Sequence, residues 1–195
     1  MENLLLIFAK NPVPGKAKTR LSKDLGVEKA MEIYKGLLSY TSSIAQACNA
    51  EKELHYADFI NEDDMWPNDQ FTKLLQEGSD LGERMQNAFQ QAFKKGFKRV
   101  LIIGTDCKDL TTDDLNLAFE KLENNDAVIG PANDGGYYLL GLSQMNQAVF
   151  QNKEWSTSSV FPNTIKTFQE EGFSFEVLEE LVDVDHASDL EQKRA

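Results

Sequence analysis

The chain alternates short apolar runs with stretches of helical periodicity. Runs of strand length occupy residues 4–9, 53–59, 100–104, 127–130, 137–142 and 175–178. Apolar residues recur at the spacing of an amphipathic helix over residues 27–48, 81–95 and 115–122. Because strands that alternate with helices are typical of βαβ units, the pattern predicts an α/β fold with a largely parallel sheet.

Polar residues mark the ends of several of these elements. Residues 111–114 (Thr-x-x-Asp) and 80–83 (Asp-x-x-Glu) have the pattern of a capping box, and residues 188–191 (Ser-x-x-Glu) favour a last short helix. The polar, acidic stretch 61–69 indicates a surface connection. An Asp-Gly-Gly sequence at 134–136 lies between two apolar runs and indicates a hairpin turn.

The size and charge of the chain restrict its class. With 195 residues and 41% hydrophobic content, it suits one domain over residues 1–195. A net charge of -12 argues against nucleic acid, because a polyanion requires lysines and arginines over a wide face. No apolar run approaches the roughly 18 residues of a membrane span. Cys48 and Cys107 form no disulfide or zinc motif, so we expect a soluble cytoplasmic protein.

Cations crowd the segment that follows the first apolar run. Lys10, Lys16, Lys18, Arg20 and Lys23 stand in an otherwise acidic chain, and open α/β sheets bind ligands where their strands end. The segment lacks the P-loop and the Gly-x-Gly-x-x-Gly fingerprints, which excludes a P-loop NTPase and the usual dinucleotide-dependent dehydrogenase. We interpret it as a loop whose amides and cations bind a small phosphate. The alternative is a solvated basic turn.

Aspartates follow other apolar runs. Asp106 comes just after the run 100–104, so we expect it at the same sheet edge. A divalent cation there takes one or two carboxylates plus substrate phosphate oxygens. The alternative is an aspartate of a turn or helix cap, which is the interpretation we favour for Asp109. Asp183 and Asp185 share one side of a segment if it is extended, and they either complete a cation site or are simply solvated.

The glycine pair after Asp134 has two interpretations. A tight turn uses Gly135 and Gly136 for their backbone freedom, and the same glycines let a ligand approach the backbone closely. In the second case Asp134 would bond hydroxyl groups or a ribose. The spacing alone leaves both open. Trp155 is a candidate for a pocket rim, and the surroundings of the two histidines support no covalent catalysis.

Four ordered motifs carry a resemblance to one bacterial family. They are Phe8-Ala9-Lys10-x-Pro12-x-Pro14-Gly15-x-x-Lys18-Thr19-Arg20-Leu21, Asp80-Leu81-Gly82-Glu83-Arg84-Met85, Gly104-Thr105-Asp106-Cys107 and Gly130-Pro131-Ala132-x-Asp134-Gly135-Gly136-Tyr137-Tyr138-Leu139-Leu140-Gly141. Together they resemble the glycosyltransferase-like family called radical-SAM/selenodomain-associated transferases, of the nucleotide-diphospho-sugar transferase superfamily. The resemblance implies a GT-A-like, three-layer α/β/α sandwich, shared with guanylyltransferases of molybdopterin and phospholactate metabolism.

The resemblance, taken with the cationic loop, also implies roles for individual residues. Asp106 and Asp134 would be catalytic, and Asp106 with Asp185 would hold Mg²⁺ or Mn²⁺. The residues expected to bind substrate are Lys10, Pro14, Gly15, Lys16, Lys18, Arg20, Arg84, Gly135, Gly136 and Tyr137.

The activity implied is that of a metal-dependent transferase that uses a nucleoside-diphosphate sugar and an unknown acceptor. One alternative is a nucleotidyltransferase that acts on a nucleoside triphosphate and a phosphorylated small molecule. Another is a non-catalytic nucleotide-binding module. The expected partner is therefore a nucleotide or nucleotide sugar, with no nucleic acid and no membrane span, and a homodimer is possible. A purely structural protein would not explain four loop motifs in one chain.

Overall fold

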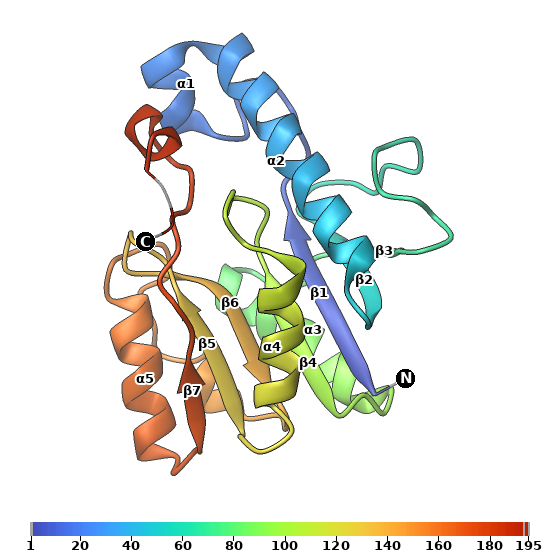
Figure 1. Ribbon diagram of the computed structural model, residues 1–195, viewed down its shortest axis with the longest axis vertical. Helices are drawn as coiled ribbons and strands as arrows, with labels where there is room; N and C mark the ends of the chain where they lie inside the picture. The colour runs from blue at the N-terminus through green and yellow to red at the C-terminus, as the bar shows by residue number, and fades with distance from the viewer. Residues whose placement is uncertain (1, 193, 195) are drawn as a thin grey trace.

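The computed structural model describes residues 2–192 and 194, and within this part of the chain seven strands form one sheet in the order β3-β2-β1-β4-β6-β5-β7 (Figure 1). The strands are β1 (Asn3–Ala9), β2 (Glu51–Tyr56), β3 (Thr72–Leu75), β4 (Arg99–Ile103), β5 (Ala127–Pro131), β6 (Tyr137–Leu142) and β7 (Phe175–Val177). Neighbouring strands are parallel except at β6, which is antiparallel to β4 and β5. The predicted α/β fold with a mostly parallel sheet is confirmed.

Helices cover both faces of the sheet. The α-helices are α1 (Thr19–Leu25), α2 (Val27–Ala47), α3 (Leu81–Lys94), α4 (Thr112–Lys121) and α5 (Val160–Glu170), and the short 3-10 helices are η1 (Gln147–Val149) and η2 (Ala187–Leu190). In Figure 1, α2 and α4 lie in front of the sheet and α3 lies behind it. The arrangement is the three-layer α/β/α sandwich of GT-A-like folds.

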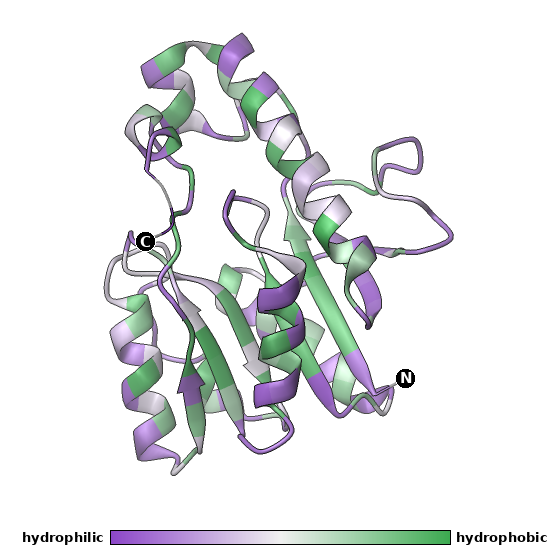
Figure 2. Ribbon diagram, in the orientation of Figure 1, coloured by the Kyte–Doolittle hydropathy of each residue, from purple (hydrophilic) through white to green (hydrophobic). Residues whose placement is uncertain are grey.

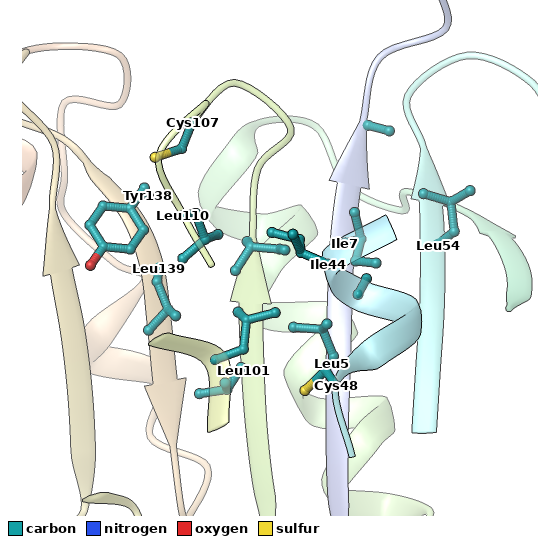
Figure 3. Close-up of a cluster of buried hydrophobic side chains, with 14 of the residues drawn as sticks. Leu5, Ile7, Ile44, Cys48, Leu54, Leu101, Cys107, Leu110, Tyr138 and Leu139 are labelled. Carbon is teal, nitrogen blue, oxygen red and sulfur yellow. The ribbon is translucent and has the colours of Figure 1, made fainter. Parts of the chain in front are cut away.

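The alternation of side chains along β1 explains the two cores. Leu5 and Ile7 belong to the cluster under α2 and α4, whereas Leu4 and Leu6 belong to the cluster under α3 and α5. Both faces of this central strand are therefore buried, which is why its sequence is a continuous apolar run. Figure 3 shows part of the first cluster, and Figure 2 shows the hydrophobic strands between helices of mixed polarity.

The sequence pattern did not indicate four elements of the structure: α1, the edge strand β3, the short 3-10 helix η1 and α5. Helix α1 buries only Leu21, and no residue of β3 is fully buried, so neither has an apolar pattern that stands out. Helix α5 contains Pro162 in its first turn, where proline is tolerated although it resembles a helix breaker in the sequence.

The helix caps agree in part with the expected motifs. The capping box of α4 is confirmed, since Thr111 and Asp114 bond each other's backbone amides. At α3, Asp80 accepts a hydrogen bond from the amide of Glu83, but the Glu83 carboxylate turns to Ser79 instead of completing the box. The last short helix expected near residues 188–191 is present as η2, but it does not start at Ser188. Instead, η2 begins at Ala187, because Asp189 caps the preceding backbone amides.

The acidic connection 61–69 is anchored more firmly than its composition indicates. Trp66 is buried, and its ring meets Phe71 edge to face with the ring centres 5.1 Å apart. The Asp64 carboxylate also lies 2.9 Å from Lys73 Nζ, and both of these side chains are largely buried. None of the helices in the described part of the chain combines the length and apolarity that a membrane crossing requires.

Candidate active site

A cleft of about 650 Å³ lies at the edge of the sheet where β1 and β4 end. In Figure 1 both of these strands point toward the side that holds α1 and the C-terminal segment. Residues from five segments of the chain line the cleft: 8–10 with 16–20, 76–85, 102–106, 134 with 136–138, and 155–160. Tyr34, Ala57, Asp183 and Asp185 complete its wall. Its position fits the rule that ligands of open α/β sheets bind beyond the carboxyl ends of parallel strands.

The first loop brings its cations to this cleft by a tight turn. The amides of Lys16 and Ala17 both donate to the Val13 carbonyl, which reverses the chain just before α1. Lys10, Lys16, Lys18 and Arg20 then line the cleft.

The outer side of the same turn carries Pro14 and Gly15, which are exposed and lie outside the cleft wall. Gly15 has φ +78°, so the turn itself requires a glycine. The structure therefore places neither of these two predicted binding residues in the cleft wall. The amides of Lys16 and Ala17 are also engaged within the turn and do not face a ligand.

Lys18 links the first loop to the acidic residues of the site. Its Nζ atom lies 3.0 Å from Asp106 Oδ1 and 3.3 Å from Asp185 Oδ1, and it donates to the Val184 carbonyl oxygen at 2.6 Å. Arg20 Nη1 lies 2.8 Å from the other carboxylate oxygen of Asp185. The cationic loop and two of the predicted aspartates thus meet directly in one cluster.

Asp183 shares this cluster, and the alternation of residues 183–185 does place both aspartates at the cleft. Burial, and then the charges of Asp106 and Asp134, raise the pKa of Asp183 to about 8, although Lys18 opposes the shift. The segment is held there by backbone bonds, including that from the Val184 amide to the Asp106 carbonyl. At neutral pH Asp183 is therefore mostly protonated, so it adds little negative charge to the acidic side of the cleft.

The turn at residues 134–136 is a hairpin turn, and part of it lies at the cleft. It joins the antiparallel pair β5 and β6, and Asp134 and Gly136 line the cleft. The Gly136 amide donates to Asp134 Oδ1 at 2.8 Å, which fixes the carboxylate. Gly135 lies outside the cleft wall: its φ is +86°, and a Cβ there would lie 2.5 Å from the backbone of Ser158. The close approach to Ser158 and the positive φ therefore both require a glycine at this position.

Arg84 and Tyr137 also line the cleft. Arg84 Nε donates to the Gly78 carbonyl at 3.0 Å, and Nη1 donates to Gln76 Oε1 at 3.3 Å. Burial raises the pKa of the Tyr137 hydroxyl, so this hydroxyl stays protonated. Trp155 lies at the rim, as its sequence context indicated, and its indole ring packs against Gly82.

Sequence reasoning missed several residues of the cleft. Tyr34 donates from its hydroxyl to the Lys10 carbonyl at 2.9 Å and lies 3.4 Å from Thr105 Oγ1, so it fixes the start of the cationic loop. Burial raises its pKa to about 12. In the sequence Tyr34 is one more apolar position of a long amphipathic helix, and nothing local distinguishes it. The polar residues missed at the rim are Gln76, Ser79, Asp80, Ser156 and Thr157.

The donors in the cleft suit a hard cation that is shared with a substrate. Among the described residues, no group of three or more His, Cys, Asp or Glu side chains is arranged to hold a metal ion. Asp106 and Asp185 nevertheless converge on one point, where their Oδ1 atoms both contact Lys18. Mg²⁺ is commonly bound by one or two carboxylates with phosphate oxygens completing its shell, so this donor set fits such an ion.

The fold and the cleft define a GT-A-like protein of the nucleotide-diphospho-sugar transferase class. The model of the family described as "Uncharacterized protein conserved in bacteria (DUF2064)" matches residues 40–157, and the chain belongs to this family. The matched part includes Arg84, Asp106 and Asp134 but neither the cationic loop nor Asp185. No curated protein sequence matches significantly.

A solved structure supports the same class. A protein from Desulfovibrio desulfuricans G20, described as a putative nucleotide-diphospho-sugar transferase, is 32% identical, with a TM-score of 0.92 over 97% of this chain and 84% of that one.

More distant structures share only the fold. One is a cytidylyltransferase from Leptospira borgpetersenii, 12% identical, with a TM-score of 0.57 over 91% of this chain and 76% of that one. Another is 4-diphosphocytidyl-2C-methyl-D-erythritol synthase from Anaerococcus prevotii. It is 9% identical, with a TM-score of 0.60 over 97% of this chain and 93% of that one.

Proposed function

We propose that this protein is a metal-dependent transferase that uses a nucleoside-diphosphate sugar as donor. The observation that carries the proposal is the meeting of cations from residues 10–20 with Asp106, Asp134 and Asp185 around one cleft of about 650 Å³. This volume falls within the usual range of small-molecule sites, roughly 300–1,000 Å³. The similarity to a protein described as a nucleotide-diphospho-sugar transferase supports the same class of substrate.

The cations of the first loop have the chemistry to bind a diphosphate. Lys10, Lys16 and Arg20 are exposed at the cleft, so each can reach a ligand without first being uncovered. The Arg20 guanidinium offers a planar fork that matches two phosphate oxygens, and the two lysines add point charges. We assign the diphosphate to this side of the cleft.

Asp106 and Asp185 would hold the Mg²⁺ or Mn²⁺ ion, which when bound would neutralise charge on the departing diphosphate. Asp134, held by the Gly136 amide, is placed to orient a hydroxyl of the sugar or of the acceptor. Transfer of this kind works by positioning and by stabilising charge on the leaving group, so it needs no covalent nucleophile.

A nucleotidyltransferase is the second candidate, because a cytidylyltransferase has the same fold. The two reactions differ in the bond that breaks. In sugar transfer, the nucleoside diphosphate leaves the anomeric carbon. In nucleotidyl transfer, the α-phosphorus is attacked and pyrophosphate leaves. The products therefore distinguish them.

The test is to incubate the purified protein and Mg²⁺ or Mn²⁺ with panels of nucleoside-diphosphate sugars and nucleoside triphosphates, with and without acceptors. We expect metal-dependent release of free nucleoside diphosphate, and a loss of more than about a hundredfold in Asp106→Ala. Asp113→Ala is the matched control, because Asp113 is exposed on the first turn of α4 and lies outside the cleft.

Three outcomes would change this assignment. Release of pyrophosphate in place of nucleoside diphosphate would identify a nucleotidyltransferase. Nucleotide binding that neither chelator nor Asp106→Ala alters, without turnover, would identify a non-catalytic binding module. Absence of both binding and turnover over the whole panel would contradict the proposal in every form.

A further inference from the structure

The Lys18 side chain is buried at the point where the proposed metal ligands converge. It is 5% exposed, whereas the nearby Arg20 side chain is 56% exposed. Its ammonium contacts three oxygens from two distant segments: Asp106 Oδ1, Asp185 Oδ1 and the Val184 carbonyl oxygen. A buried ammonium requires such compensation, since without it the desolvation cost is large. The site is therefore built around a cation supplied by the chain itself.

The same oxygens cannot serve this ammonium and a divalent ion at once. The Lys18 Nζ atom is within 3.3 Å of Oδ1 of both aspartates, so a metal bound to these atoms would lie against a positive charge. A phosphate group in the cleft offers the displaced ammonium another anionic partner.

We propose that the Lys18 ammonium is a place-holder for the divalent cation in the ligand-free protein and exchanges these carboxylates for substrate phosphate when the metal binds. The inference rests on the proposed function, because it takes Asp106 and Asp185 as the metal ligands. The inference also predicts that the metal binds weakly by itself and binds more tightly when a diphosphate is present.

The surrounding contacts allow this exchange without unfolding the site. Arg20 bonds Oδ2 of Asp185, not the oxygen that Lys18 uses, so it still holds that carboxylate when Lys18 leaves. The Val184 amide donates to the Asp106 carbonyl at 2.9 Å, which fixes the two acidic segments to each other through the backbone. Lys18 alone has to move.

The experiment measures Mn²⁺ binding to substrate-free protein by electron paramagnetic resonance, for the wild type, Lys18→Gln and Lys18→Arg. Glutamine removes the charge but keeps a donor for the Val184 carbonyl, whereas arginine keeps the charge. Lys23→Gln is the control, since Lys23 is an exposed lysine of α1 outside the cleft. We expect Lys18→Gln to bind Mn²⁺ at least about tenfold more tightly than the wild type, and the other two variants to bind no more tightly.

Titrations with added pyrophosphate then test the place-holder role of Lys18 separately from the proposed function. Adding it should tighten Mn²⁺ binding to the wild type more than to Lys18→Gln, because only the wild type has an ammonium to transfer. Equal Mn²⁺ affinity in the wild type and Lys18→Gln overturns the place-holder and leaves the proposed function standing. No Mn²⁺ binding by any variant, even with pyrophosphate, overturns the place-holder together with the metal dependence of the proposed function.

A measurement on the unaltered chain covers the case in which Lys18→Gln does not fold. Amine-reactive labelling followed by mass spectrometry reports how accessible the Lys18 ammonium is. Saturating Mn²⁺ alone should increase the labelling of Lys18 by several fold, and pyrophosphate with Mn²⁺ should protect it again, while labelling of Lys23 stays constant. Labelling of Lys18 that does not respond to Mn²⁺ overturns the proposal.

Discussion

Arg20 lies in the first turn of α1, where its guanidinium is exposed to the cleft and pairs with Asp185 at 2.8 Å. An exposed ion pair of this kind contributes little to stability, typically about 0–1 kcal/mol. Only its Nη1 atom contacts Asp185, so the other N–H groups of the guanidinium can bind a ligand oxygen while this pair is kept. Its position beside a metal-ligand candidate is better explained by binding than by folding.

Replacing Arg20 with alanine tests this role. We expect Arg20→Ala to weaken binding of a nucleoside diphosphate by roughly tenfold or more and to leave binding of the nucleoside nearly unchanged, because charge-assisted bonds to phosphate carry the difference. Isothermal titration calorimetry with matched ligand pairs measures both. Lys23→Ala is the control for net charge. An equal loss for diphosphate and nucleoside would show that Arg20 does not contact the phosphates.

The elements α2 and α3 contain a pair of glycines in contrasting surroundings. Gly82, in the first turn of α3, packs so closely against Trp155 that a Cβ would lie 2.2 Å from the indole Nε1 atom. Gly36 lies within α2, is exposed, and would meet nothing within 4 Å. The first glycine lets Trp155 close the rim of the cleft, and the second has no such contact.

These surroundings predict opposite effects of the same substitution. Gly82→Ala should lower the free energy of unfolding by about 1–3 kcal/mol, because the indole ring has to move. Gly36→Ala should raise it by about 0.5–1 kcal/mol, because alanine is the better helix former. Urea unfolding followed by circular dichroism measures both. A gain in stability for Gly82→Ala would mean that Trp155 is not fixed in this position.

At the scale of the whole molecule, Glu53 connects the sheet to the helical layer behind it. Its carboxylate is buried on β2, lies 2.6 Å from Nζ of Lys95 at the end of α3, and lies 3.2 Å from His55 Nε2. Burial alone would raise the pKa of Glu53, but the hydrogen bonds from His55 and Lys95 outweigh it and lower the pKa below 4.5.

The lowered pKa of Glu53 gives stability a defined dependence on pH. A depressed folded-state pKa contributes stability above the unfolded value, and this contribution is lost as the pH falls through the folded value. The unfolding free energy of the wild type should therefore exceed that of Glu53→Gln at pH 6, and the difference should shrink between pH 5 and pH 3. Glu51→Gln, an exposed position of the same strand, is the control. A difference that stays constant with pH would contradict this assignment.

The cleft itself shows how far sequence reasoning reached. Lys10 and Asp106 were expected at the same sheet edge, because each follows an apolar run of strand length. The structure brings them to one cleft, since β1 and β4 are parallel neighbours with Ile7 opposite Ile103. Pro14 and Gly15 belong to the same motif, yet they face away, because the direction of a tight turn is set by its hydrogen bonds. A motif identifies the loop, but it does not say which of its residues face the ligand.

The amino-acid sequence by itself determined six of the seven strands, the helices α2, α3 and α4, and the cationic loop, since these depend on periodicity and composition within a few neighbouring residues. Only the tertiary structure decided that residues 181–185 lie beside Cys107 and Ala132 and so bring Asp185 to Lys18. It also decided that Tyr34 fixes the backbone of Lys10. The physical reason is that contacts between residues far apart in the chain depend on how the elements pack, and no local pattern contains that information.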